Sequence, residues 1–549
     1  MSSFVYEPTE SISPQGHSAE LGDFILQGHC DVGGQHGDEN SSDIPLLTGI
    51  VALLVLFTLA TFAGWTTSPA AVSHHEATHP TDPAPDHPVE KPEHLAEDAH
   101  HHGATPHVLA CLPFLLLLGS IAVLPLFRAT EHWWESNTNR LMVAVGLALV
   151  TLFYYGLIYP DGGISAVWQR LDHAILKEYI PFIVLLFALY SISGGVRIEG
   201  NLVAKPLTNT TFILLGGLLA SFIGTTGAAM LLIRPLLETN RGRRHVQHTV
   251  VFFIFVVCNC GGCLLPIGDP PLFLGYLQGV PFLWTLTALW QPWLLVNASL
   301  LTVYLMLDLW YYYPREDRSK MARADLEAGV GIRVRGLALS APLLLGVILS
   351  VAILDPNKAI PGTDFYPWVY LRESIQLALI GISTFFGSKA IRVENRFNYH
   401  AIIEVAALFV GIFICMQPAL EILNQYGPQL GINTPQKFFW ITGGLSAVLD
   451  NAPTYLVFFQ TADAQFGAER LVDSLHDSNS AAYRDLMAIS LGAVFMGAMT
   501  YIGNGPNFMV RAIAEESGVR MPSFFGYVIF YSLPILLPVM GLTAVIFLW

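Results

Sequence analysis

Two aspartates stand in stretches of the chain that are otherwise apolar. Asp269 lies in the sequence Ile-Gly-Asp-Pro-Pro-Leu-Phe at 267–273, and Asp450 lies in Asp-Asn-Ala-Pro-Thr at 450–454. A carboxylate at the centre of a bilayer costs about 2.5–3.5 kcal/mol on insertion scales, so such a group is usually retained for a task. Because a proton and a metal cation compete for one carboxylate, both residues are candidates for ion exchange. The structural alternative is that each caps the N-terminus of a half-helix.

Neutral side chains with oxygen atoms accompany these acids. Hard cations such as Na⁺ bind carboxylate, hydroxyl and carbonyl oxygens. The free amides of a half-helix N-terminus can instead hold an anion, so the charge of the ligand stays open. The residues that we predict to bind an ion or substrate are Asp450, Asn451, Thr454, Asp269, Gly268, Thr225, Thr226, Asn259, Asn504 and Asn507.

The segment around Asp269 has a counterpart near the C-terminus. The sequence Ile-Gly-Asn-Gly-Pro-Asn-Phe at 502–508 also interrupts a long apolar run with glycine, a polar residue and proline. Glycine and proline both disfavour a continuous helix. In a bilayer, the backbone groups left unpaired by such a break are tolerated only where they line a cavity. A matched pair of broken helices is typical of a transporter with its binding site near the membrane midplane.

The composition indicates a membrane protein. Of 549 residues, 53% are hydrophobic and only 13% are charged, whereas soluble proteins have roughly 25% charged residues. The chain has no basic domain and no Walker motif, so we expect neither a nucleic-acid partner nor coupling to ATP. We predict a secondary transporter rather than an enzyme, without a cofactor. The cysteines at 258, 260 and 263 are expected to pack within an apolar helix rather than to bind metal.

The apolar stretches are about 20 residues long, which is the length that spans a bilayer. Two of them, 207–236 and 437–460, carry polar residues in their middle and are predicted to be re-entrant hairpins. The predicted spans are 44–65, 108–127, 139–160, 179–196, 248–266, 283–309, 335–354, 368–387, 400–420, 485–503 and 524–548.

The N-terminal part divides by composition. Residues 1–43 are predicted to be a disordered cytoplasmic tail, 44–65 a transmembrane helix, and 66–107 an extracytoplasmic linker rich in histidine and proline. The sequence His-Glu-Ala-Thr-His at 75–79 matches a zinc-protease pattern, but it lacks the helical context that the pattern needs. The linker histidines predicted as weak metal ligands are His74, His75, His79, His100, His101 and His102.

The distribution of positive charge predicts an inverted repeat in the transporter domain, 108–548. Basic residues at 241–244, 310–335 and 388–399 are expected to be cytoplasmic. The two hairpins then enter the membrane from opposite sides. Repeat one covers about 179–309 and repeat two about 400–548, with connecting helices at about 335–387.

The hairpin sequences resemble those of a known superfamily. The stretch Ala-Ser-Phe-Ile-Gly-Thr-Thr-Gly-Ala-Ala-Met-Leu-Leu-Ile-Arg-Pro at 220–235 resembles the first hairpin of NhaD-like sodium/proton antiporters, and Asp-Asn-Ala-Pro-Thr-Tyr at 450–455 resembles the second. These antiporters belong to the ion transporter superfamily, with ArsB-type permeases and citrate or dicarboxylate carriers. The resemblance implies an all-α polytopic membrane protein with inverted repeats, each with a re-entrant hairpin and a broken transmembrane helix. It also implies elevator-type motion and commonly a homodimer.

Two departures bear on the transported solute. Thr225 and Thr226 stand where sodium/proton antiporters tend to place an acid–amide pair, and the Ser-Asn-Thr signature of dicarboxylate carriers is absent from both hairpins. We predict an antiporter of a prokaryotic inner membrane that exchanges Na⁺ or Li⁺ for protons. The alternatives are a sodium- or proton-coupled symporter of citrate or another organic anion, a histidine-rich sensor of metal or pH, and a metalloenzyme that uses His75, Glu76 and His79.

Overall fold

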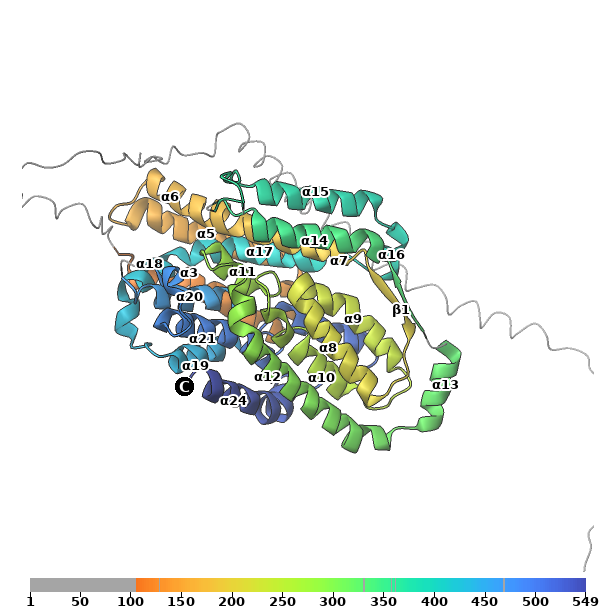
Figure 1. Ribbon diagram of the computed structural model, residues 1–549. Helices are drawn as coiled ribbons and strands as arrows, with labels where there is room; N and C mark the ends of the chain where they lie inside the picture. Colours follow the sequence, from red (N-terminus) through yellow and green to blue (C-terminus); the bar gives the residue numbers. More distant parts are fainter. Residues whose placement is uncertain (1–104, 128, 329–330, 357, 361, 468–469) are drawn as a thin grey trace, which may run out of the picture. The chain divides into compact units, whose positions relative to one another are not determined.

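The computed structural model describes residues 105–549, apart from 128, 329–330, 357, 361 and 468–469. The predicted tail, the span 44–65 and the linker histidines His74, His75, His79, His100, His101 and His102 lie outside the described residues. The described part is mainly helical, with many apolar helices packed side by side (Figure 1), which is compatible with a polytopic membrane protein.

The first described helices pack against a helix from the second half of the chain. α5 (Asn137–Phe153) lies along α17 (His400–Cys415), and α3 (Leu112–Val123) contacts both. Several apolar side chains of α5, such as Leu149, are exposed, as expected for a helix that faces lipid. The short elements of this region are η1 (Val108–Cys111), η2 (Leu124–Leu126), α4 (Glu131–Glu135) and η3 (Tyr154–Ile158).

A central helix, α7 (Ile180–Ser193), connects two groups of elements. It continues α6 (Ile164–Leu171) and η4 (Asp172–Tyr179). It contacts α14 and α15, which run beside it in Figure 1, and also α9, α11 and α17. The bounds of this outer group are α14 (Leu337–Ile353), α15 (Leu371–Phe386) and α16 (Lys389–Glu394).

Two pairs of helices turn back on themselves at the segments predicted to be hairpins. α8 (Pro206–Ile223) and α9 (Thr225–Thr239) are joined at Gly224, whose φ of 79° is readily adopted by glycine. α19 (Pro435–Ser446) and α20 (Asn451–Asp463) are joined by a turn that ends at Asp450. The two helices of each pair pack against each other.

The two predicted helix breaks are present and are longer than the sequence suggested. α10 (Gln247–Val256) ends eleven residues before Ile267, where we predicted the interruption. The cysteines at 258, 260 and 263 therefore lie in turns and in η5 (Cys260–Cys263), not in an apolar α-helix as predicted. The chain resumes as α11 (Pro270–Leu277).

Close packing explains why α10 stops early. A Cβ on Gly261 would lie 2.5 Å from the Cα of Gly217 in α8, so the two backbones touch here. The second break has the same order, α21 (Ala481–Met496), η10 (Gly497–Met499) and α22 (Gly505–Glu516). The core lies around these elements, since residues 250–257 and 488–494 are all buried.

Each broken helix is followed by a longer apolar helical stretch. The first is formed by α12 (Trp284–Leu307), η6 (Asp308–Tyr312) and η7 (Tyr313–Arg315). The second is formed by α23 (Phe524–Tyr527), η11 (Val528–Leu536) and α24 (Leu537–Phe547). α12 and α24 contact each other.

Within the described residues, five helical stretches are long and apolar enough to cross a membrane: Asn137–Ile158, Ile164–Ser193, Pro206–Ile223, Trp284–Arg315 and Phe524–Phe547. A sixth would be α17 followed by α18 (Gln417–Tyr426) and η8 (Gly427–Leu430), which are bent by 43°. The bend interrupts the span predicted at 400–420, because the ring of Pro418 clashes with the carbonyl four residues earlier.

A small antiparallel sheet was not predicted. β1 (Arg197–Asn201) pairs with β2 (Gly331–Arg335) in the register Arg197 opposite Arg335. The chain is therefore mainly but not entirely helical. Each strand has only five residues. Ile332 and Val334 of β2 do alternate with arginines, but β1 has no such alternation and a single short stretch is a weak signal of a strand. The remaining short helices are α13 (Arg318–Ala328) and η9 (Leu471–Ser474).

Candidate functional site

The N-termini of four helices meet around one carboxylate. Asp269 is the N-cap of α11 and Asn504 is the N-cap of α22. Thr225 and Asn451 are the first residues of α9 and α20. All three polar partners donate hydrogen bonds to the side chain of Asp269, so two hairpin turns and two helix breaks, far apart in sequence, form one site.

The carboxylate of Asp269 is buried and fully partnered. Its side chain accepts from Thr225 Oγ1 at 3.0 Å and from Asn504 Nδ2 at 3.2 Å on Oδ1, and from Asn451 Nδ2 at 2.9 Å on Oδ2. The residue is 1% exposed. No lysine or arginine hydrogen-bonds or pairs with it in the described part of the chain. The side chains that contact Asp269 are thus neutral, with hydroxyl and amide groups that can present oxygen as well as hydrogen.

Glycine allows the first break to approach the first hairpin. The carbonyl of Gly268 accepts a hydrogen bond from the amide of Thr225 at 2.9 Å. A Cβ on Gly268 would lie 2.1 Å from the carbonyl oxygen of Gly262, which is far inside van der Waals contact. A comparable approach occurs in the second break, where a Cβ on Gly503 would lie 2.5 Å from the carbonyl oxygen of Gly497.

A chain of buried amides extends from Asp269 into the second break. Asn504 Nδ2 also lies 3.3 Å from Asn259 Oδ1, and Asn259 Nδ2 donates to Asn507 Oδ1 at 2.7 Å. Asn507 in turn donates to the carbonyls of Gly497 and Thr500 at 2.9 and 3.0 Å. Asn259, Asn504 and Asn507 are therefore brought together, but the NH₂ group of Asn507 is used to close the second break rather than facing the site.

Three predicted residues make no hydrogen bond to this cluster within the described residues. Asp450 is half-buried and accepts from the amide of Ala452 at 3.1 Å, which makes it the N-cap of α20. Thr454 Oγ1 donates to the carbonyl of Asp450 at 2.9 Å. Thr226 is half-buried, and its side chain makes no hydrogen bond within the described residues. The adjacent Asn451, rather than Asp450, is the residue of the second hairpin that reaches Asp269.

The predicted site residues include no thiol, and the described cysteines agree with a packing role. Cys258, Cys260 and Cys263 are free and buried. No group of three or more His, Cys, Asp and Glu residues able to hold a metal ion occurs within residues 105–549 as described. The oxygen and amide groups around Asp269 are the arrangement in this region that could bind a hard cation or a carboxylate.

A large cavity, which the sequence did not reveal, lies at the other end of α9. It has a volume of about 1060 Å³ and is lined by parts of β1, α9, α10 and the residues that follow α22. Seven arginines and three glutamates line it. A cavity with a surplus of one charge concentrates ligands of the opposite charge and speeds their association. The only signal in the sequence was the cluster of arginines at 241–244. We interpreted this cluster as the mark of a cytoplasmic loop, not as part of a binding site.

One family model matches the chain from residue 103 to residue 548, and its description is "Putative citrate transport". No curated protein matches the chain. The matched range contains both hairpins, both helix breaks and every residue of the site around Asp269. The resemblance to citrate-transporter-like permeases is thus confirmed at the level of the family. Because the match covers most of the sequence, the chain belongs to this citrate transport family.

Proposed function

We propose that this protein is a secondary transporter of citrate or a related di- or tricarboxylate, coupled to Na⁺ or protons. The observation that carries the proposal is the convergence of four helix N-termini on Asp269. N-termini attract anions, and the buried carboxylate among them can bind a cation. The family assignment therefore favours the citrate symporter, which was the alternative to antiport in the sequence analysis.

The charges of the site suggest how a cation and an anion are coupled. Each helix N-terminus carries roughly half of a positive elementary charge, so four of them offset the carboxylates of Asp269 and Asp450. When one Na⁺ or proton binds to Asp269, a surplus of about one positive charge is left. That surplus favours a carboxylate of the solute, which the amides of the first helical turns can hold. The cation is expected to raise the affinity for the anion.

The order of elements supports alternating access. A helix pair that turns back at the site follows a central helix, α7 or α17, and precedes a broken helix in each half. We interpret the pairs as re-entrant hairpins and the halves as inverted repeats of about 179–309 and 400–548. The hairpins, α11 and α22 would then carry the solute as one body. The homodimer and the prokaryotic inner membrane remain predictions.

A second candidate is the Na⁺(Li⁺)/H⁺ antiport that the sequence first suggested. It is favoured by the neutral oxygen-bearing groups of Thr225, Asn451 and Asn504 around Asp269, since these suit Na⁺ when the amides turn their oxygens inward. In this case citrate would have no role, and protons would leave the site whenever Na⁺ binds.

Flux measurements in proteoliposomes separate the two candidates. For a symporter, an inward gradient of Na⁺ or protons should drive accumulation of radiolabelled citrate. For an antiporter, addition of Na⁺ without citrate should change the internal pH, read with a pH-sensitive dye. Failure of every cation gradient to drive citrate uptake would refute the first proposal.

The variant Asp269→Asn tests the site itself. It keeps the size of the side chain but removes the charge that binds the cation, so accumulation of citrate should no longer respond to either gradient. Asp450→Asn is the comparison variant: it removes the other carboxylate counted in the site, and asparagine caps a helix about as well as aspartate. Asp450→Asn should keep gradient-driven accumulation, though with weaker dependence on the cation. Unchanged gradient-driven uptake in Asp269→Asn would contradict its role.

A further inference from the structure

The cavity at the C-terminal end of α9 contains more positive charge than its own acids neutralise. Seven arginines face three glutamates, with two histidines also in the lining. Its volume of about 1060 Å³ is at the upper end of the roughly 300–1,000 Å³ that is typical of small-molecule sites. Whether this charge is free for a ligand depends on which guanidinium groups already have carboxylate partners.

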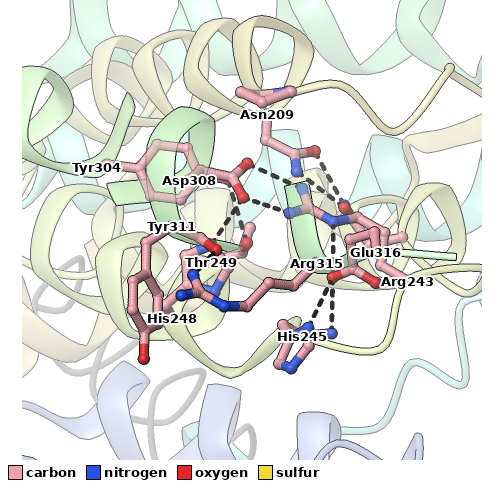
Figure 2. Close-up of polar contacts among 12 residues, drawn as sticks. Asn209, Arg243, His245, His248, Thr249, Tyr304, Asp308, Tyr311, Arg315 and Glu316 are labelled. Atoms are coloured by element: carbon pink, nitrogen blue, oxygen red, sulfur yellow. Dashed lines mark hydrogen bonds and ion pairs between the residues drawn. The ribbon is translucent and has the colours of Figure 1, made fainter. Parts of the chain in front are cut away.

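Figure 2 shows the polar contacts around Arg243, one of the arginines that line the cavity. Arg243 binds both oxygens of Asp308, with one contact at 2.9 Å, and lies 3.5 Å from a carboxylate oxygen of Glu316. His248 Nε2 is 3.1 Å from Asp308, and its ring stacks on Tyr312 at 3.9 Å. This buried cluster joins the turn between α9 and α10 to the end of the α12 stretch. The Nε of Arg243 has no hydrogen-bond acceptor within the described residues, but this side chain is fully buried and already faces two carboxylates, so it is not open to a solute.

Other arginines of the lining are also paired. Arg197 contacts Glu199 at 3.0 Å and Glu394 at 3.2 Å. Arg396 forms an ion pair with Glu516. Arg241 has an interaction partner as well. Most carboxylates near the cavity are therefore already paired with an arginine. Glu238, which also lines the cavity, is exposed.

The side chains of three other arginines that line the cavity have no carboxylate partner in the part of the chain that the structure describes. Arg234, Arg244 and Arg520 make no ion pair and no side-chain hydrogen bond within the described residues. Arg244 and Arg520 are exposed, whereas Arg234 is half-buried and its Nε is enclosed without a partner. An enclosed guanidinium nitrogen without an acceptor is costly, so a ligand oxygen there would be favoured.

The position of Arg234 relates the cavity to the site around Asp269. Both Thr225 and Arg234 lie on α9, nine residues apart. At 1.5 Å per residue, this places Arg234 about 13.5 Å along the helix from the site. Nine residues are about two and a half turns, so Arg234 and Thr225 lie on opposite faces of α9, and the cavity and the site around Asp269 are separate places on one helix. The loop charges predict that the C-terminal end of α9 is cytoplasmic.

We propose that the cavity holds a second binding site for polycarboxylates, in which Arg234 binds one carboxylate and Arg244 and Arg520 attract the others. The identity of the ligand class rests on the proposed function. Guanidinium and carboxylate form paired parallel hydrogen bonds, which is why arginine suits this ligand better than lysine. The second site would concentrate the solute at the cytoplasmic side of the protein.

The first test measures binding directly. Citrate is titrated by calorimetry into the purified full-length protein in detergent, with Arg234→Gln, Arg234→Lys and Arg333→Gln beside the wild type. Arg333 is the matched control, because it is an exposed arginine of β2 that does not line the cavity. Loss of a charge-assisted hydrogen bond should weaken binding roughly tenfold in Arg234→Gln. Arg234→Lys should be intermediate, and Arg333→Gln should match the wild type.

Inorganic phosphate serves as the competing probe. Phosphate that binds as tightly as citrate at Arg234 would overturn the assignment to polycarboxylates. Equal citrate affinity in Arg234→Gln and Arg333→Gln, with both proteins folded, would overturn the second site itself.

The second test separates this inference from the proposed function. In proteoliposomes, the KM for citrate presented on the cavity side should rise about tenfold in Arg234→Gln, with a smaller change in kcat, and the rise should shrink at high salt. If the wild type moves no polycarboxylate, the proposed function fails, while calorimetry still decides whether Arg234 binds citrate. If the wild type transports and Arg234→Gln has an unchanged KM, only the second site fails.

Discussion

Gly268→Ala tests whether the close contact between the first break and the first hairpin holds the site together. The added methyl group would lie 2.1 Å from the carbonyl oxygen of Gly262 and 2.9 Å from the Cα of Ser221. Both neighbours are backbone atoms, which cannot move aside by rotating a side chain. Overpacking a core costs about 1–3 kcal/mol, and we expect the upper end of that range here.

The same substitution should also weaken the site. If the break moves away to make room, the hydrogen bond of 2.9 Å from the Thr225 amide to the Gly268 carbonyl is lost. That bond adds about 0.5–1.5 kcal/mol, so with overpacking near 3 kcal/mol the total is about 3.5–4.5 kcal/mol. Asp269 follows Gly268 directly, so its contacts with Thr225 and Asn451 should loosen together.

Gly505→Ala is the control for this prediction. Gly505 is the first residue of α22 in the second break, and a Cβ there would meet no atom within 4 Å. Such a change is expected to be neutral or to stabilise the protein by about 0.4–1 kcal/mol. Thermal unfolding in detergent, with and without citrate, compares the two variants. A Gly268→Ala protein with the melting temperature and citrate response of the wild type would refute the argument that the two backbones must touch.

Three further predictions follow from buried or paired polar groups. Arg243→Gln leaves Asp308 and Glu316 without their buried partner, so it should destabilise the protein by about 3–5 kcal/mol; a melting temperature like that of Arg333→Gln would contradict this. Asn240→Ala removes one partner of the reciprocal amide pair with Asn209 (2.8 and 2.9 Å), at an expected cost of about 1–3 kcal/mol by chemical denaturation; no measurable loss would show that the pair is dispensable. The hydrogen bond from Arg335 lowers the pKa of Glu199, so this link between β1 and β2 should persist at neutral pH and be lost as the pH falls below the ordinary glutamate value of about 4.3. The protection factors of the amides at 197–201, which are exchange rates corrected for the intrinsic rate at each pH, should fall on acidification in the wild type but not in Glu199→Gln, and a parallel fall in both would argue against the link.

The residues of the site could be chosen from the sequence because they violate its local pattern. Asp269, Asn504 and Gly268 stand in apolar runs where glycine and proline forbid a regular helix, and this conflict was visible without coordinates. The same reasoning also selected Asp450, which follows an apolar segment as Asp269 does. In the structure Asp450 caps its own helix, and the neighbouring Asn451 reaches the cluster instead. Neighbouring residues at a turn point in different directions, and the spacing of residues in the sequence does not tell which of them points towards the site.

The sequence by itself determined the class of the protein, its helical character, and the places where helices must stop, since these follow from hydrophobicity and from glycine and proline. It did not determine that Thr225, Asn451 and Asn504 share one carboxylate, because those contacts join residues 44, 182 and 235 positions from Asp269. Nor did it reveal the cavity, whose arginines come from β1, from α9 and from the segments after α9, α16 and α22. Which of those arginines are neutralised depends on carboxylates that only the packing of distant helices places beside them.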